Sequence, residues 1–154
     1  MKKVIYSVTL VLTVVLFTAG CGSSNTIKCT LESDQSASGY KIKAEYVIYK
    51  DGDIASKVET TETIESSNTT VLSYFEKSAK EQYKTNNEKY GGYDYKITNE
   101  NGKVTSKVIV DYTKQDLNKF IEDNPAMKSY VNEDNKLTVD GVKTMYESLG
   151  ATCK

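Results

Sequence analysis

The chain has 154 residues, 20 basic and 21 acidic side chains, and no histidine, arginine or tryptophan. This length fits one globular domain that is large enough to bury a hydrophobic core. The nearly balanced charge argues against a nucleic-acid partner, because phosphate recognition needs a basic surface.

The missing residue types also exclude common kinds of chemistry. Without histidine the chain lacks the commonest general base near neutral pH and the base of Ser-His and Cys-His nucleophile pairs. It also lacks the usual ligand of zinc and copper, and without arginine it has no bidentate clamp for carboxylate or phosphate. We therefore expect a protein that is not an enzyme and that carries no metal or cofactor.

The first twenty-one residues have the layout of a bacterial secretory signal. Lys2 and Lys3 precede a mainly apolar run over residues 4–17, and Thr18-Ala19-Gly20-Cys21 follows. This predicts a signal peptide over residues 1–20, a lipid on Cys21, a short tether over residues 21–25 and a single extracytoplasmic domain over residues 26–154. An uncleaved membrane anchor and a plain signal peptide cut elsewhere remain the alternatives.

The other two cysteines, Cys29 and Cys153, lie near the two ends of the predicted domain. An even number of cysteines in an exported domain indicates a disulfide, and two free buried thiols are the alternative. Such a bridge would close nearly the whole domain into one loop. Because Cys29 follows Cys21 so closely, we expect the domain to be held at this end, with two hairpin turns pointing away from the anchor.

Alternating apolar residues predict strands in the first half of the domain. One covers residues 26–31, and a second covers residues 40–49 with Tyr40, Ile42, Ala44, Tyr46 and Ile48 on one face. Asp51-Gly52 suits a tight hairpin turn, and a return strand follows over residues 54–64. Ser67 or Asn68 can cap a helix that carries Val71, Leu72, Phe75, Ala79 and Tyr83, and Gly91-Gly92 ends it.

The second half repeats this order of elements. Strand patterns at residues 93–98 and 104–112 flank a second hairpin signal, Asn101-Gly102. Thr113 and Asp116 resemble a capping box before a short helix, Pro125 can open another helical turn, and a last helix is expected near residues 140–149. The segments 51–58 and 101–108 also match in sequence, through duplication or through shared hairpin chemistry.

These elements predict the α+β class. We expect an antiparallel sheet of four to six strands, including two hairpins, packed on one face by two or three helices.

Three groups of residues are candidates for chemistry or binding. Ser38 and Lys41 match a Ser-x-x-Lys pattern, but the local alternation predicts a loop and a strand there instead of the required helix. Glu59, Glu62 and Glu65 are better explained as a solvated face than as paired catalytic carboxylates. Tyr90, Tyr93 and Tyr95 could stack on a sugar or a peptide, although packing against the helices explains them as well.

Several of these features together resemble the YehR-like small bacterial lipoproteins, which carry a domain of unknown function. The resemblance rests on the lipobox-like start, the hairpin, the Val-Ile-Val-Asp-Tyr-Thr stretch over residues 108–113 and the closing helix before Gly150. The motifs Lys28-Cys29-Thr30 and Thr152-Cys153-Lys154 are similar to a subset from low-GC Gram-positive bacteria. The resemblance implies an α+β lipoprotein fold and brings no reaction or catalytic residue.

We therefore expect a lipid-anchored protein on the outer face of the cell membrane. Its partner would be a protein, a peptide or a glycan, bound without catalysis. The alternative is an inhibitor of, or an enzyme acting on, cell-wall or secreted-protein substrates.

Overall fold

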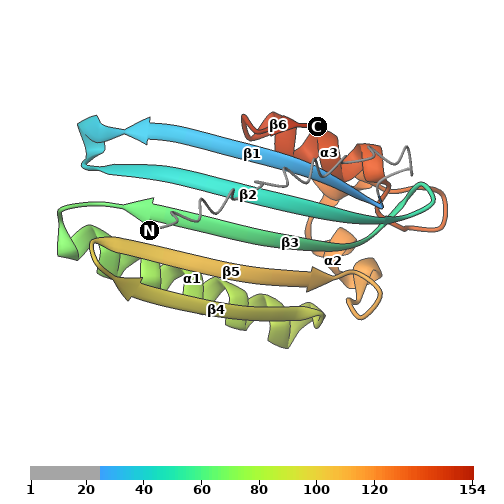
Figure 1. Cartoon of the computed structure of the whole chain (residues 1–154). Helices are drawn as coiled ribbons and strands as arrows, with labels where there is room; N and C mark the ends of the chain where they lie inside the picture. Colours follow the sequence, from blue (N-terminus) through green and yellow to red (C-terminus); the bar gives the residue numbers. More distant parts are fainter. Residues whose placement is uncertain (1–24) are drawn as a thin grey trace, which may run out of the picture.

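The computed structural model describes residues 25–154, which form a six-stranded antiparallel sheet with helices on one face (Figure 1). The predicted signal peptide, the lipidation residue Cys21 and the tether before Asn25 lie outside the described residues. No helix within the described part is long and apolar enough to cross a membrane. The α+β class and the single antiparallel sheet are thus confirmed.

The elements follow one another along the described chain, and the strand order in the sheet is β4-β5-β3-β2-β1-β6. In chain order they are β1 (Thr26–Gln35), the 3-10 turn η1 (Ser36–Ser38), β2 (Tyr40–Asp51), β3 (Ile54–Glu65), α1 (Thr69–Tyr90), β4 (Tyr93–Glu100), β5 (Lys103–Asp111), α2 (Leu117–Asp123), the 3-10 turn η2 (Pro125–Tyr130), α3 (Val139–Ser148) and β6 (Thr152–Cys153).

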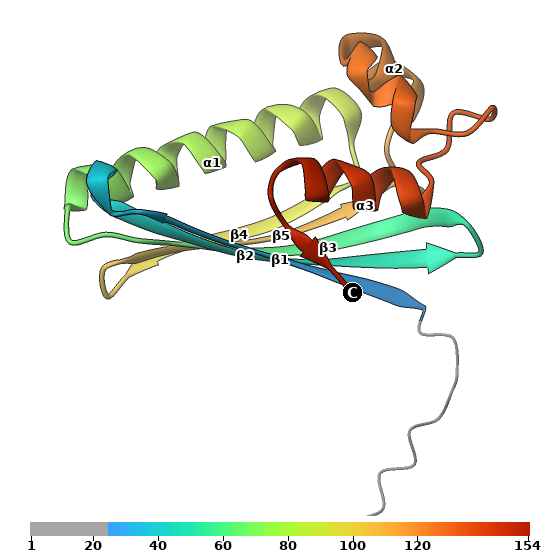
Figure 2. The same cartoon turned by 90° about the horizontal axis from the view of Figure 1, so that it is seen from above.

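Side-chain alternation gives the sheet two different faces. On β2, the side chains of Ala44, Tyr46 and Ile48 are buried on the covered face, while Lys41 and Lys43 are exposed on the helix-free face. Figure 2 shows α1 and α3 on the same side of the sheet, and the opposite side carries no helix. This is the antiparallel arrangement with one face packed and one solvated, as the sequence predicted.

The two predicted hairpins form, although one turn is displaced by a residue. Asn101 and Gly102 both have positive φ, 55° and 72°, which is the conformation that a tight hairpin turn of this kind requires. In the first hairpin Asp51 still pairs with Ile54, so the turn residues are Gly52 and Asp53 instead of Asp51 and Gly52. A register shift between Tyr49 and Lys50 accompanies this displacement.

Each helix begins at a polar cap. The Asn68 side chain accepts hydrogen bonds from the amides of Thr70 and Val71 at the start of α1. The cap of α2 is Asp116, whose carboxylate accepts from the Lys119 amide at 3.0 Å. The predicted role of Thr113 as that cap is therefore wrong: its hydroxyl donates to the carboxylate of Asp111, the last residue of β5.

Each of the two longer helices packs mainly on strands that belong to the other half of the chain. The helix that follows the β2–β3 hairpin, α1, packs mainly on β4 and β5. The last helix, α3, follows the β4–β5 hairpin in sequence and packs on β1, β2 and β3. Each hairpin therefore buries its apolar face only when the other half of the chain is in place, which makes the domain one cooperative unit.

The main core lies between α3 and the first three strands. Its largest fully buried side chains are those of Ile48, Leu137, Val58 and Val142. The rings of Tyr46 on β2 and Tyr146 on α3 stack with their centroids 4.0 Å apart. By contrast, only Leu72 and Tyr90 of α1 are buried, so this helix is held by fewer apolar contacts.

The two ends of the sheet differ in what they carry. The Lys50 amide donates to the Asn25 carbonyl at 3.0 Å, so the start of the domain lies beside the β2–β3 turn. The Asn101-Gly102 turn lies at the opposite end, because Lys103 pairs with Glu65 across β5 and β3. Only this second hairpin turn points away from the start of the domain, and the expectation that both do so is wrong.

Candidate functional site: the distal loops and the helix-free face

A disulfide joins the first strand to the last, between Cys29 on β1 and Cys153 on β6. These two residues are direct partners in the sheet, and the neighbouring Lys28 and Lys154 exchange both backbone hydrogen bonds, at 3.1 and 2.9 Å. Cys29 and Cys153 thus occupy a non-hydrogen-bonded pair, where side chains of antiparallel strands come closest. The predicted pairing is confirmed.

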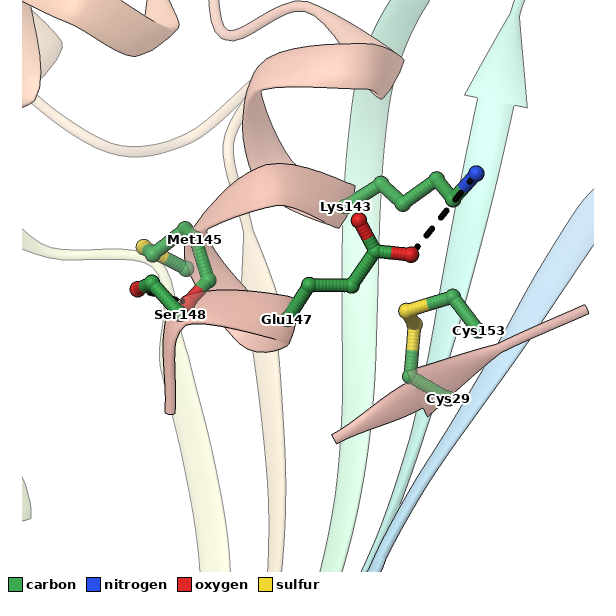
Figure 3. The surroundings of a disulfide bond; sticks show 6 residues. All are labelled: Cys29, Lys143, Met145, Glu147, Ser148 and Cys153. Atoms are coloured by element: carbon green, nitrogen blue, oxygen red, sulfur yellow. Dashed lines mark hydrogen bonds and ion pairs between the residues drawn. A yellow bond between two sulfur atoms is a disulfide. The ribbon is translucent and has the colours of Figure 1, made fainter. Parts of the chain in front are cut away.

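The surroundings of the bridge show how the chain end is held. Figure 3 shows the disulfide beneath α3, near an ion pair that joins Lys143 to Glu147 at 3.7 Å. Cys29 is fully buried in the core cluster, and Cys153 packs against that cluster. The bridge therefore fastens the C-terminal strand to the core beside the place where the described chain begins.

The three tyrosines singled out from the sequence lie in the helix–sheet interface. Tyr90 is 8% exposed and packs edge-on against Phe120, with ring centroids 5.1 Å apart. Tyr95 packs on Tyr83 of α1 at 5.7 Å, and burial raises the pKa of Tyr93. These contacts use the aromatic rings for packing between α1, α2 and β4.

The three glutamates of β3 separate onto the two faces. Glu59 and Glu65 lie on the helix-free face, where Lys57 and Lys103 pair with them at 2.7 and 2.9 Å. Glu62 lies on the covered face, directly between Ala44 and Ser106 of the neighbouring strands. The interpretation as a solvated face thus fails for Glu62.

Burial raises the pKa of Glu62, and the carboxylate has no hydrogen-bond or ion-pair partner among the described residues. Its negative charge in turn contributes to the raised pKa values of Tyr46 and Tyr83. Small residues flank it in the sheet, since Ala44 and Ser106 are both buried. Glu62 therefore interrupts the apolar pattern of the covered face. A half-buried carboxylate without a partner destabilises the folded state.

The Ser38–Lys41 pattern has no catalytic geometry. Ser38 ends the 3-10 turn η1, and Lys41 lies on β2, where its ammonium group pairs with Asp34 at 3.0 Å. Side-chain and backbone hydrogen bonds from Ser36, together with Lys41, lower the pKa of the Asp34 carboxyl to about 2. Within residues 25–154 no group of three or more metal-ligating side chains is gathered in one place.

A hollow lies at the distal end, the end of the sheet opposite Asn25. It has a volume of about 550 Å³, and three connections meet around it: the β1–β2 turn, the β3–α1 connection and the β4–β5 turn. Its lining is rich in serine, glycine and asparagine: Ser36, Gly39, Tyr40, Lys41, Glu65, Ser66, Ser67, Asn101, Gly102 and Lys103.

One serine ties these three distal connections together. The Ser66 hydroxyl donates to the Gly39 carbonyl at 2.6 Å, and the Ser66 amide donates to the Gly102 carbonyl at 3.1 Å. Ser66 also accepts from the amide of Asn68, the residue that caps α1. The distal loops are therefore fixed relative to one another, which reduces the ordering that binding would require.

A chain of aromatic rings leads from this hollow to solvent. Tyr40 packs edge-on against Phe75 of α1 with centroids 5.1 Å apart, and Phe75 in turn contacts Tyr74 at 5.7 Å. Tyr74 is 66% exposed, although the other aromatic residues named here are at least half-buried. Sequence reasoning missed Tyr74 and Ser66. The signal for Tyr74 was available, because it falls outside the apolar stripe of its helix.

The helix-free face is an ordered array of charged and threonine side chains. Four lysines on it pair with carboxylates on the same or a neighbouring strand: Lys28 with Glu45, Lys41 with Asp34, Lys57 with Glu59 and Lys103 with Glu65. Lys43 and Glu32 form a longer contact at 3.8 Å. Such exposed pairs contribute little stability but keep the face soluble.

No protein-family model matches the chain, and neither does any curated protein. Among solved structures, the NMR structure of Escherichia coli YehR is similar, with a TM-score of 0.50 and 17% identity over 82% of this chain and 88% of that one. An NMR structure of a protein from Streptococcus pneumoniae TIGR4 is also similar, with a TM-score of 0.44 and 15% identity over 100% of this chain and 96% of that one. The likeness to YehR at this identity concerns the fold, and the described domain has a YehR-like fold.

Proposed function

We propose that this protein is a lipid-anchored lipoprotein of the bacterial envelope, of the kind found in low-GC Gram-positive bacteria, that binds a partner without catalysis. The charged start, apolar run and Ala19-Gly20-Cys21 support the anchor. The Cys29–Cys153 bridge supports the compartment, because structural disulfides form and persist in oxidising surroundings outside the cytoplasm.

The separation of the two ends of the domain is the observation that carries this proposal. Asn25, four residues after Cys21, lies beside the β2–β3 turn, and the distal hollow lies at the other end of the sheet. The twelve residues of β2 span about 40 Å between these ends. A lipid on Cys21 would therefore hold one end at the membrane and present the distal loops outward.

The distal loops suit recognition of a protein, a peptide or a glycan. Tyrosine, serine, glycine and asparagine dominate binding loops in general, because they combine rigid aromatic area with adaptable hydrogen bonding. Here Tyr40, Ser66 and Asn101 line the hollow, and the exposed Tyr74 is linked to Tyr40 through the ring of Phe75. The lysines that line it are neutralised by Asp34 and Glu65, so the surface favours an uncharged or mixed-charge partner.

The anchor is tested by metabolic labelling with an alkyne fatty acid. We expect wild-type protein to carry the label and Cys21→Ala to lose it and leave the membrane fraction, because the thiol of Cys21 is the attachment point. Cys153→Ala serves as the matched control, since it removes another cysteine and should keep the label. An unlabelled wild type, or label that survives Cys21→Ala, would refute the anchor.

The binding end is tested by site-specific photo-crosslinking in intact cells. A photoreactive residue in place of Tyr74 samples the distal loops, and one in place of Asp53 samples the opposite end; both positions are exposed. We expect crosslinked products from position 74 and few from position 53. Equal crosslinking from both positions, or more from position 53, would contradict the proposed orientation.

A further inference from the structure

Two lysines face each other on the helix-free face without any neutralising partner. Lys96 on the edge strand β4 and Lys107 on β5 are direct cross-strand partners, and both are exposed. Neither forms an ion pair or a side-chain hydrogen bond within the part of the chain that the structure describes. Like charges directly opposite each other on a sheet are destabilising, so this pair opposes folding.

The other lysines of this face show that pairing is the rule there. Lys28, Lys41, Lys57 and Lys103 each have a carboxylate oxygen within 3.0 Å, and Lys43 has one at 3.8 Å. The exception is therefore local to two adjacent positions. Breaks of a local rule of this kind are concentrated at functional sites in proteins.

The matching segments of the two hairpins show why Lys57 has a carboxylate partner and Lys107 has none. Lys57 and Lys107 occupy equivalent positions in the segments 51–58 and 101–108. Two residues after Lys57 comes Glu59, which pairs with it at 2.7 Å. Two residues after Lys107 comes Ile109, so the second hairpin has an apolar side chain where the first has the neutralising carboxylate.

A hollow of about 300 Å³ lies next to the lysine pair, lined by Lys96, Thr98, Glu100, Thr105 and Lys107. Thr98 and Thr105 are also direct cross-strand partners, so two ammonium groups and two hydroxyls, all hydrogen-bond donors, come from adjacent rows of one hairpin. Lysine binds phosphate as a point charge, and the hydroxyls can donate to phosphate oxygens. Glu100 can accept from hydroxyl groups that the rest of the ligand carries.

Two simpler explanations of the unpaired lysines explain only part of the arrangement. A lysine on an edge strand can protect the sheet from pairing with another chain, which explains Lys96 but leaves Lys107 on the interior strand β5 unexplained. A flat anionic membrane would need a broadly basic surface, whereas this face carries about as many carboxylates as lysines. Asp94 and Glu100 also lie on this face of β4, so the unpaired positive charge is restricted to the Lys96–Lys107 row.

From these observations, we propose that Lys96, Lys107, Thr98 and Thr105 form a binding site for a single phosphate group on a small or polymeric hydroxyl-bearing ligand. The hollow at this site shares no lining residue with the distal hollow, and the proposal does not depend on the function proposed for the distal loops. Binding would neutralise the repulsion between the two ammonium groups and would therefore stabilise the fold.

The test uses the full chain in an uncharged detergent, with inorganic phosphate and glycerol 1-phosphate as probes. Backbone amide shifts in an NMR titration should move at residues 96–98 and 105–107, and phosphate should raise the thermal midpoint. Lys96→Gln/Lys107→Gln should weaken the dissociation constant at least tenfold and abolish the thermal shift. The charge-matched control Lys28→Gln/Lys43→Gln, on the same face, should bind like the wild type.

A second variant supplies the missing partner and leaves both lysines in place. Ile109→Glu recreates the spacing of Lys57 and Glu59, so Lys107 should pair with the new carboxylate and phosphate binding should fall several-fold. Unmoved amides at residues 96–107 in the wild type, or equal weakening in the Lys28/Lys43 control, would overturn the proposal. Binding to phosphatidylglycerol vesicles that the double variant loses, without binding of either soluble probe, would assign the pair to a membrane surface and also overturn it.

Discussion

The two faces of the sheet follow the same alternation and differ in what breaks it. On the covered face, apolar side chains pack under α1 and α3, and the exception is the carboxylate of Glu62. On the helix-free face, lysines pair with carboxylates, and the exception is the unpaired Lys96 and Lys107. One face thus has a charge where it should be apolar, and the other has two like charges where it should be neutral.

The comparison shows which face determines stability and which is available for recognition. Burial of apolar surface contributes far more than exposed ion pairs, so the covered face holds the fold together. Charged residues on the helix-free face can be substituted with little loss of stability, so a ligand site can evolve there. Changes on the covered face should alter unfolding, and matched changes on the helix-free face should alter binding.

The largest effect is expected from the bridge that closes the covered face. Cys29→Ala/Cys153→Ala should lower the free energy of unfolding by about 2–5 kcal/mol, because the bridge joins residues 124 positions apart and restricts the unfolded chain. Urea unfolding of oxidised protein measures the loss. The double variant and the wild-type protein both carry Cys21→Ser here, so that no third thiol interferes.

Reduced wild-type protein is the control for this bridge. Its stability should match that of the alanine variant to within about 1 kcal/mol, because both lack the same constraint and bury similar small side chains. A loss below about 1 kcal/mol in both samples would show that the sheet pairing of β1 with β6 holds the chain end without the bridge. That result would show that the disulfide is not the largest single contribution to the free energy of unfolding on the covered face.

Much of this two-faced arrangement could be predicted from the sequence, because the signals are local. Alternation placed Tyr46 and Ile48 opposite Lys43, and the Asn101-Gly102 turn formed where its residues allow positive φ. The direction in which the β2–β3 turn points could not be predicted from local signals. It depends on the pairing of β1 with β2, and pairing between strands is not encoded in either strand alone.

The candidate surfaces were harder to predict for the same reason. The disulfide followed from the number and context of the cysteines, but the distal hollow needs three connections that are far apart in sequence. Ser66 joins its own connection to the other two through hydrogen bonds that no sequence pattern specifies. Likewise, Lys96 and Lys107 are unremarkable in sequence, and they become a pair only through the register of β4 and β5.

A smaller effect on stability is expected when the same change, glutamate to glutamine, is made once on each face of the sheet. Glu62→Gln removes a half-buried charge from the covered face, and Glu45→Gln removes an exposed one from the helix-free face, where it pairs with Lys28 at 2.6 Å. At pH 7 we expect Glu62→Gln to raise the free energy of unfolding by about 1 kcal/mol and the thermal midpoint by a few degrees. Glu45→Gln should leave it unchanged or lower it by less than about 1 kcal/mol.

The pH dependence of this difference tests its cause. Burial raises the pKa of Glu62 in the folded protein above its ordinary value of 4.5, so the unfolded chain loses this proton at lower pH than the folded one. The contribution of Glu62 to wild-type stability should therefore fall as the pH rises from 4.5 through the raised pKa, and the advantage of Glu62→Gln should grow over the same interval. Well below pH 4.5 the carboxyl is protonated in both states, and the advantage should disappear. An advantage of equal size at pH 4 and pH 7 in thermal unfolding would show that shape, not charge, distinguishes the covered face at this position.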